Sequence, residues 1–115
     1  MDLFHITTHA AWESAQAVGE YRAPSLATEG FIHLSEDRQW LATANRFYRG
    51  VRDLVLLRIA SDRLRAEVRH EPADGDRFPH LYGALNLDAV TAVVALPLDE
   101  DGGISLPAEH AGVVS

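Results

Sequence analysis

The chain has 115 residues, which is enough for one compact domain with its own hydrophobic core. Apolar residues make up 47% of it and charged residues 23%, so its composition is that of a folded globular chain and not of a disordered one. The formal net charge of −7 argues against a protein that holds long nucleic acid through its overall field, and we expect no nucleic-acid partner.

The residue types that are missing narrow the chemistry further. All ten basic residues are arginine, and the chain has neither lysine nor cysteine. This excludes a disulfide framework, a thiolate zinc site, a catalytic cysteine and a lysine Schiff base. No apolar run has the length of a transmembrane helix, and no signal-peptide pattern opens the sequence. We therefore expect a cytoplasmic protein without membrane contact, while the sequence gives no indication of oligomeric state.

The first residues predict a strand followed by a helix. Residues 3–6 are mainly apolar and predict a short strand. Thr7 and Thr8 then offer hydroxyls that can cap a helix over residues 9–18, and Gly19 is expected to end it.

The next segment predicts a loop, a strand and a second helix. Residues 21–28 show little periodicity and are expected to form a loop, and residues 30–34 predict a strand. Ser35 is followed by two acidic residues, which predicts a helix start because the hydroxyl can cap it and the acids face its positive end. This helix is expected to run through Phe47 and to stop at Gly50.

The second half of the chain predicts mostly extended structure. Residues 54–59 are nearly all apolar, which is typical of a strand covered on both faces. Residues 66–71 alternate weakly and predict another strand, whereas residues 72–79 contain two prolines and a glycine and are expected to form a loop. Residues 80–85 and 89–96 predict the last extended segments.

These elements predict an α+β fold with five or six strands and two main helices. Residues 1–98 are expected to form a single compact domain. Residues 99–115 hold four acidic residues, no arginine and a Gly-Gly pair, and are expected to form an acidic tail.

Three histidines occupy positions where one element gives way to the next, and such positions often carry function. His5 lies just before the first helix, His33 ends an apolar strand, and His80 follows a Phe-Pro pair. Each could instead be a structural residue that forms hydrogen bonds, which is the commoner role of a histidine at a strand end. A third alternative is a metal site in which the three imidazoles converge and leave one position open for water.

The residues around these histidines resemble the bacterial family called domain of unknown function 952. The segments that carry the resemblance, over roughly residues 3–97, are Phe4-His5-Ile6-Thr7, Trp12, Gly19-Glu20-Tyr21, Gly30-Phe31-Ile32-His33-Leu34-Ser35 and Phe78-Pro79-His80-Leu81-Tyr82-Gly83. That family is in turn similar to the ADP-ribosyltransferase superfamily, and in particular to the RNA 2′-phosphotransferases. Those enzymes carry a His-Gly-Thr and a Val-His-Leu-Ser segment. The resemblance implies a split, mostly antiparallel β core with a cleft that binds NAD.

The resemblance also implies roles for the residues that match those two segments. His5 would hydrogen-bond the ribose next to adenine, and Thr7 would support that contact. His33 and Ser35 would lie near the nicotinamide end of the cofactor or brace the cleft. Where the enzymes have glycine between histidine and threonine, this chain has Ile6, which would crowd a cofactor that approaches the backbone.

Other residues complete the expected site. His80 would contact the cofactor, Tyr82 would stack on a planar ring, and Arg49 or Arg58 would face a phosphate. Glu71 is expected to act as a catalytic residue together with His33. A carboxylate at that place would orient a ribose hydroxyl and stabilise the positive charge that develops when the glycosidic bond breaks.

The expected function is therefore the binding of NAD, ADP-ribose or a similar small nucleotide in this cleft, with ADP-ribosyl transfer as the candidate reaction. The competing hypothesis is a regulatory or binding module that uses the same pocket without chemistry. A histidine-rich metal site is the third hypothesis.

Overall fold

The structure is a computed structural model that describes residues 1–105. Its helices and strands, in chain order, are β1 (Asp2–Thr8), α1 (His9–Val18), β2 (Glu20–Tyr21), α2 (Pro24–Thr28), β3 (Ile32–His33), α3 (Trp40–Phe47), β4 (Leu54–Ala60), β5 (Glu67–Ala73), β6 (Asp76–Tyr82), β7 (Leu85–Asn86) and β8 (Val90–Leu96). The paired strands are antiparallel, so the predicted α+β class with a mostly antiparallel core is confirmed.

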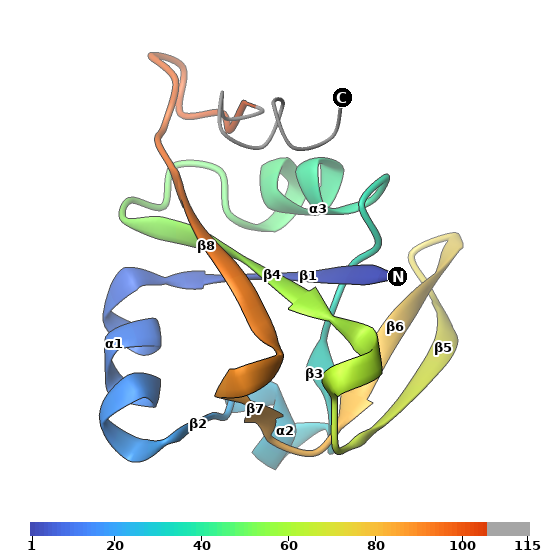
Figure 1. Ribbon diagram of the computed structural model, residues 1–115. Coiled ribbons are helices and arrows are strands. Elements are labelled where there is room, and N and C mark those ends of the chain that lie inside the picture. Colours follow the sequence, from blue (N-terminus) through green and yellow to red (C-terminus); the bar gives the residue numbers. More distant parts are fainter. Residues whose placement is uncertain (106–115) are drawn as a thin grey trace.

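The main sheet has the strand order β1-β4-β8, with α1 and α3 packed on opposite sides of it (Figure 1). Successive side chains of a strand point to opposite faces. Leu54 and Leu56 of β4 accordingly join the core beneath α3, whereas Val55, Leu57 and Ile59 join the core beneath α1. The prediction that this apolar strand is covered on both faces is therefore confirmed.

A second sheet, with the order β3-β6-β5, stands beside the first (Figure 1). The two meet where the backbone of Ser35 exchanges hydrogen bonds of 2.8 Å with Phe4 of β1. One face of the second sheet is apolar, and Ile32, Leu81 and Val68 on it contribute to the α1-side core. Because this face points inward, the opposite face is left for the polar side chains that build the site.

The expected loop over residues 72–79 was wrong, because β5 and β6 form a long hairpin through most of it. The turn between them contains only Asp74 and Gly75, which have φ values of 51° and 79°. Aspartate and glycine are favoured in such two-residue hairpin turns because both tolerate positive φ. The prolines that suggested a loop, Pro72 and Pro79, instead lie inside the strands, opposite Arg77 and His70.

Two helix predictions also need correction. The segment expected to be a loop over residues 21–28 contains the last residue of the short strand β2 and the five-residue helix α2, which has proline at its first position, where a missing N–H costs nothing. The helix expected to start at Ser35 starts instead at Trp40. Ser35 cannot begin it, because both of its backbone hydrogen-bonding groups pair with Phe4. By contrast, α1 has the predicted bounds, with Thr8 as its cap and Gly19 at its end.

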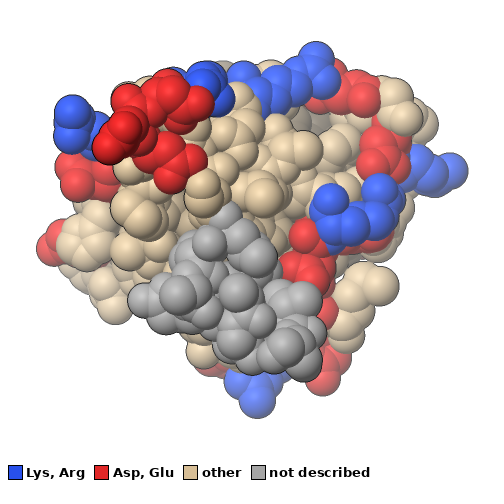
Figure 2. Space-filling model, turned by 90° about the horizontal axis from the view of Figure 1, so that it is seen from above, with Lys and Arg blue, Asp and Glu red and all other residues tan. Residues whose placement is uncertain are grey.

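Part of the expected acidic tail packs on the domain. Ile104 is buried among the residues beneath α3, and its backbone N–H and C=O bond the side chain of Asn45 at 2.8 and 2.7 Å. Residues 106–115 lie outside the described residues, so the boundary at residue 98 stays a prediction. Seen from above, acidic and basic groups lie around the edge of the molecule, with a cluster of acidic groups at the upper left beside basic ones (Figure 2).

The helices among residues 1–105 are all too short or too polar to cross a lipid bilayer. The longest, α1, has 10 residues, whereas a membrane-spanning helix needs about 20.

Candidate functional site

The polar face of the second sheet brings the candidate residues together through strand register. His33 of β3 is paired directly with His80 of β6, so their side chains share one face. On the other side of β6, His80 is paired with Arg69 and Phe78 with Glu71, so these residues share the same face. Side chains alternate between the two faces in Phe31-Ile32-His33 and in His80-Leu81-Tyr82. Ile32 and Leu81 therefore point into the core, and the residues on either side of them point to the site.

His80 is hydrogen-bonded to a carboxylate behind it. The residue is only 4% exposed, and its Nδ1 lies 2.9 Å from Oε1 of Glu71. The hydroxyl of Tyr82 donates a short hydrogen bond to the same oxygen. Both bonds lower the pKa of Glu71, and the bond from Tyr82 has the larger effect. The carboxyl group of Glu71 is therefore ionised at neutral pH. Arg69 lies 4.4 Å above the ring of Tyr82 and covers it.

Aromatic rings enclose the imidazole of His80. Phe31 is stacked on it with a centroid distance of 4.0 Å and an interplanar angle of 18°. The ring of His33 meets it edge-on at 5.3 Å, and a hydrogen bond of 3.0 Å to Glu29 holds His33 from the other side. The Nε2 atom of His80 is buried and has no hydrogen-bond partner among the residues that the structure describes.

His5 belongs to a second, inner cluster. Its Nδ1 donates to the backbone carbonyl of His33 at 2.7 Å, and its Nε2 lies 2.8 Å from the hydroxyl of Tyr21. That hydroxyl is also 3.0 Å from Oγ1 of Thr7. Because the carbonyl can only accept, the neutral ring carries its proton on Nδ1, and Tyr21 donates to Nε2. Burial lowers the pKa of His5 from its ordinary value of 6.5 to about 4 and raises that of Tyr21.

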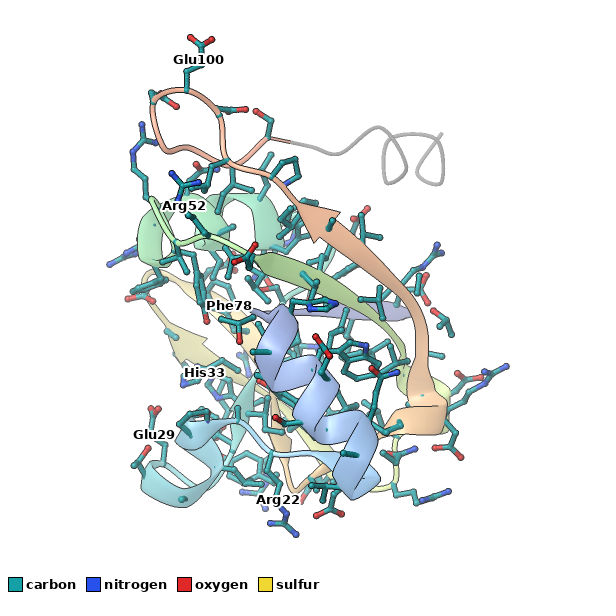
Figure 3. The ribbon with its side chains drawn as sticks, turned by 90° about the vertical axis from the view of Figure 1, so that its left-hand side faces the viewer. Arg22, Glu29, His33, Arg52, Phe78 and Glu100 are labelled. Atoms are coloured by element: carbon teal, nitrogen blue, oxygen red, sulfur yellow. The ribbon has the colours of Figure 1, made fainter. Side chains whose placement is uncertain are left out.

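A cavity of about 900 Å³ opens beside both clusters. Its walls come from β1, α1, β2, β3, α3 and β6, together with the segment that leads from β2 into α2. In the side-on view His33 lies between Phe78 and Glu29, with Arg22 at the lower end of the molecule (Figure 3). Most of the lining side chains are apolar or aromatic, with histidines and hydroxyls between them, which is the usual character of a small-molecule site.

The structure brings most of the predicted site residues to this cavity. Those that line it are His5, Thr7, His33, Ser35 and His80. Glu71 and Tyr82 do not line it but lie behind His80, to which they are connected through Oε1 of Glu71. The predicted contacts of these residues with a cofactor stay predictions.

The predicted arginines lie elsewhere. Arg49 is paired with Asp101 at 3.0 Å and Arg58 with Asp2 at 2.6 Å, and neither lines the cavity. The arginine that does line it is Arg22, which the sequence analysis did not single out.

The three histidines do not form the alternative metal site. Both ring nitrogens of His5 are already bonded within the protein, so they are not available to an ion that His33 and His80 could share. Among residues 1–105 no group of three or more histidine, cysteine, aspartate or glutamate side chains is arranged to hold a metal.

Sequence reasoning also missed two aromatic partners of the histidines. Tyr21 was expected to lie in a loop, although it bonds His5, and Phe31 was noted only as part of a motif, although it stacks on His80. The alternation of Phe31 with Ile32 and His33 could have placed Phe31 on the histidine face. No local pattern indicates the contact between Tyr21 and His5, since it joins separate strands.

Comparisons with known proteins give matches without an activity attached. The chain matches the family described as Protein of unknown function (DUF952) over residues 6–93. It is similar to the crystal structure of protein CC0527 from Caulobacter crescentus, with 35% identity, a TM-score of 0.87, and coverage of 96% of this chain and 99% of that one. The solution NMR structure of CC0527 has 35% identity, a TM-score of 0.79 and coverage of 95% of each chain. No curated protein matches the chain.

Proposed function

The chain belongs to the DUF952 family, whose description assigns no function, and we propose that it binds a small nucleotide-like ligand of the NAD or ADP-ribose class. The observation that carries the proposal is a cavity of about 900 Å³ whose wall includes His80, a buried residue with an unpartnered ring nitrogen. Small-molecule and cofactor sites usually have volumes of roughly 300–1,000 Å³ and a few polar groups in an apolar wall. Buried polar atoms are normally hydrogen-bonded, so a ligand that supplies the missing partner would be stabilised.

The cavity walls offer what the parts of a nucleotide need. Phe47, Tyr48 and Phe78 provide aromatic surface for a planar base or nicotinamide ring. Ser25 and Ser35 provide hydroxyl groups near which ribose oxygens could bind.

Arg22 is the residue that would meet a phosphate. It lines the cavity and is exposed, and its Nε is 2.5 Å from Oε2 of Glu20. An exposed ion pair of this kind contributes little to stability, so Arg22 can exchange its partner for a phosphate at small cost. A guanidinium group suits this purpose because it can bind two phosphate oxygens at once.

Calorimetric titration with NAD, ADP-ribose, AMP and nicotinamide tests the proposal, with thermal unfolding as a second measurement. We expect binding by at least one phosphate-containing compound, with a rise in melting temperature that follows its concentration. Arg22→Gln should weaken that binding, whereas Arg52→Gln, which changes an arginine outside the cavity lining, should not. Absence of binding by all four compounds at millimolar concentration would contradict the proposal.

ADP-ribosyl transfer is the reaction we propose for this site. In it, the bond between the ribose and nicotinamide breaks with its electron pair going to nicotinamide, while an acceptor oxygen gives its proton to a basic side chain of the site or to solvent and forms the new bond to the ribose. Glu71 and His33 are the proposed catalytic residues. Release of nicotinamide from NAD measures the reaction, and Glu71→Gln should abolish it. Glu67→Gln, on the same strand but paired with Arg69 instead of His80, is the control and should not.

Binding without chemistry is the second candidate, and one observation favours it. Oε1 of Glu71 already accepts hydrogen bonds from His80 and Tyr82, and Glu71 does not line the cavity, so it does not face a ligand directly. Binding of NAD with no release of nicotinamide over hours would support this candidate and remove the transferase.

A further inference from the structure

The arrangement of Glu71, His80 and Tyr82 determines which nitrogen of His80 carries the proton. An ionised carboxylate can only accept hydrogen bonds, so Nδ1, at 2.9 Å from Glu71, must be the protonated nitrogen. In the neutral imidazole Nε2 is then left with a bare lone pair. Tyr82 donates to the same carboxylate oxygen and keeps Glu71 ionised, which strengthens this choice of tautomer.

The protein closes most approaches to this lone pair. Glu71 occupies the Nδ1 side of the ring, Phe31 is stacked at 4.0 Å on one face, and the ring of His33 meets it edge-on at 5.3 Å. His80 also lines the cavity, and Nε2 has no partner among the described residues. A hydrogen-bond donor held in the cavity, against the part of His80 that lines it, would supply the partner that the buried Nε2 lacks.

Comparison with His5 shows that the unpartnered nitrogen is specific to His80. The two histidines are similarly buried, at 7% and 4% exposure, and each holds its Nδ1 proton on an oxygen acceptor. For His5 the second nitrogen is bonded to Tyr21, but for His80 it is not bonded to the protein. The acceptors also differ, since His5 donates to a neutral carbonyl and His80 to a carboxylate, which can stabilise a positive imidazolium.

We propose that His80 is the proton acceptor of this site, and that Glu71 is the positioning residue that holds its Nε2 lone pair ready for a hydroxyl group of the bound ligand or for a water beside it. In the step, the O–H bond breaks, its proton forms an N–H bond at Nε2, and the electron pair stays on the oxygen, which becomes a nucleophile. The imidazolium keeps its Nδ1 proton and is stabilised by the carboxylate of Glu71. The inference rests on the cavity of the proposed function but not on the identity of the ligand.

The assignment changes how Glu71 would act. Instead of touching a ribose hydroxyl itself, Glu71 acts through His80, which stands between it and the cavity. Tyr82 then acts as a second hydrogen-bond donor to Glu71. It does not offer a stacking surface to a ligand, because Arg69 covers its ring and the ring centroid of Phe31 lies 5.3 Å from its own.

The first test needs no ligand. NMR spectra of ¹⁵N-histidine-labelled protein should show that the neutral form of His80 has Nδ1 protonated and Nε2 bare, and Glu71→Gln should weaken that preference. A neutral His80 protonated on Nε2, or a tautomer preference that Glu71→Gln leaves unchanged, would overturn the inference.

The second test uses NAD and ADP-ribose as probes. A bound probe that donates to Nε2 should change the ¹⁵N shift of that atom in His80 while leaving His5 unchanged. If a probe binds and the His80 signals do not move, the inference is wrong although the proposed function stands. If neither probe binds, the proposed function is lost, and the tautomer measurement decides the inference alone.

Two substitutions separate a chemical from a structural role. His80→Asn keeps an amide donor near the position of Nδ1 for Glu71 and removes Nε2, whereas His80→Gln places its amide near the position of Nε2. If the wild type releases nicotinamide from NAD, His80→Asn should lower kcat about 100-fold or more and change the dissociation constant of NAD by less than about threefold. Circular dichroism confirms that the variant folds. Turnover at the wild-type rate in folded His80→Asn would overturn the inference.

Discussion

The two buried histidines beside the cavity differ in how completely the protein satisfies them. His5 has a partner at each ring nitrogen, from the backbone of β3 and from Tyr21 of β2, and burial lowers its pKa to about 4. His80 is held by Glu71 on one side and has no protein partner on the other. A fully bonded neutral imidazole joins strands and resists protonation, whereas an imidazole with a carboxylate behind it and a free lone pair can react. This difference in hydrogen bonding is the basis of the proposed chemical role of His80 and of our expectation that His5 supports the fold.

The largest effect that tests this contrast is the loss of stability on removing His5. His5→Leu leaves the carbonyl of His33 buried without a side-chain partner and removes one of the two partners of the Tyr21 hydroxyl, and we expect it to lower the free energy of unfolding by about 2–4 kcal/mol. Urea denaturation at pH 7.5 measures it. His5→Asn, which keeps a donor near the position of Nδ1, should lose less. A loss below about 1 kcal/mol for His5→Leu would show that the inner cluster does not support the fold.

The pH dependence of stability should carry the signature of His5. In the unfolded chain this histidine binds a proton near its ordinary pKa of 6.5, but in the folded protein only near 4. Between these two pH values the unfolded state binds more protons than the folded state. The contribution of His5 to the free energy of unfolding is therefore fully present above pH 6.5 and is lost as the pH falls toward 4. The loss amounts to about 3 kcal/mol at most.

Unfolding measured from pH 8 to pH 4 tests this dependence, with His5→Leu as the control. The variant should show a shallower fall in stability between pH 6.5 and 4.5. Carboxylates with lowered pKa values, Asp76 beside Arg38 and Gln39 among them, are present in both proteins, so their contribution below about pH 5 cancels in the comparison. Equal slopes in the two proteins would mean that His5 is not shielded from protonation.

Removing the hydroxyl of Tyr21 should have an intermediate effect. Tyr21→Phe deprives Nε2 of His5 of its donor and makes the inner cluster resemble that of His80, with one nitrogen unpartnered. We expect a loss of about 1–2 kcal/mol in the free energy of unfolding. The variant should retain the Nδ1-protonated tautomer of His5, since the bond to the carbonyl of His33 remains. A stability equal to that of the wild type would weaken the distinction drawn between the clusters.

The matched substitution beside His80, Tyr82→Phe, should have the smallest effect on stability. Tyr82→Phe removes a hydrogen bond to Glu71, a carboxylate that is one-third exposed and can exchange the lost donor for water. We expect an unfolding free energy within error of the wild type but a higher pKa for the carboxyl group of Glu71, because the bond from Tyr82 is the largest cause of its lowered value. Carbon-13 NMR titration of Glu71 measures the change. An unchanged pKa would show that Tyr82 does not keep this carboxylate ionised.

Local signals predicted those elements whose stability is local. The hydroxyl of Thr8 caps α1 through the N–H of Ala11 at 3.1 Å, and Gly19 ends it with φ at 102°, so neighbours in the sequence determine both helix ends. The apolar run in β4 indicated burial on both faces because alternate side chains of a strand always point apart.

Predictions failed where distant pairing overrode a local preference. Prolines such as Pro72 and Pro79 usually indicate a loop. The hairpin tolerates Pro79 because its missing N–H falls where the pairing with β3 ends. There the N–H of Leu34 donates to the Pro79 carbonyl at 3.0 Å, and Pro79 has no N–H to donate in return. Ser35 lost its role as a helix cap for a similar reason, since β1 captures its backbone.

The sequence by itself determined which side chains share a face. The alternation around His33 and His80 sets them opposite Ile32 and Leu81, and this follows from the geometry of an extended chain. Only the tertiary structure decided what each histidine nitrogen meets, because Tyr21, Glu71 and the carbonyl of His33 reach the rings through strand pairing. His5 and His80 therefore differ in their hydrogen-bond partners. The strength of a hydrogen bond depends on where donor and acceptor lie in space, and the residues next to each histidine in the sequence do not determine that position.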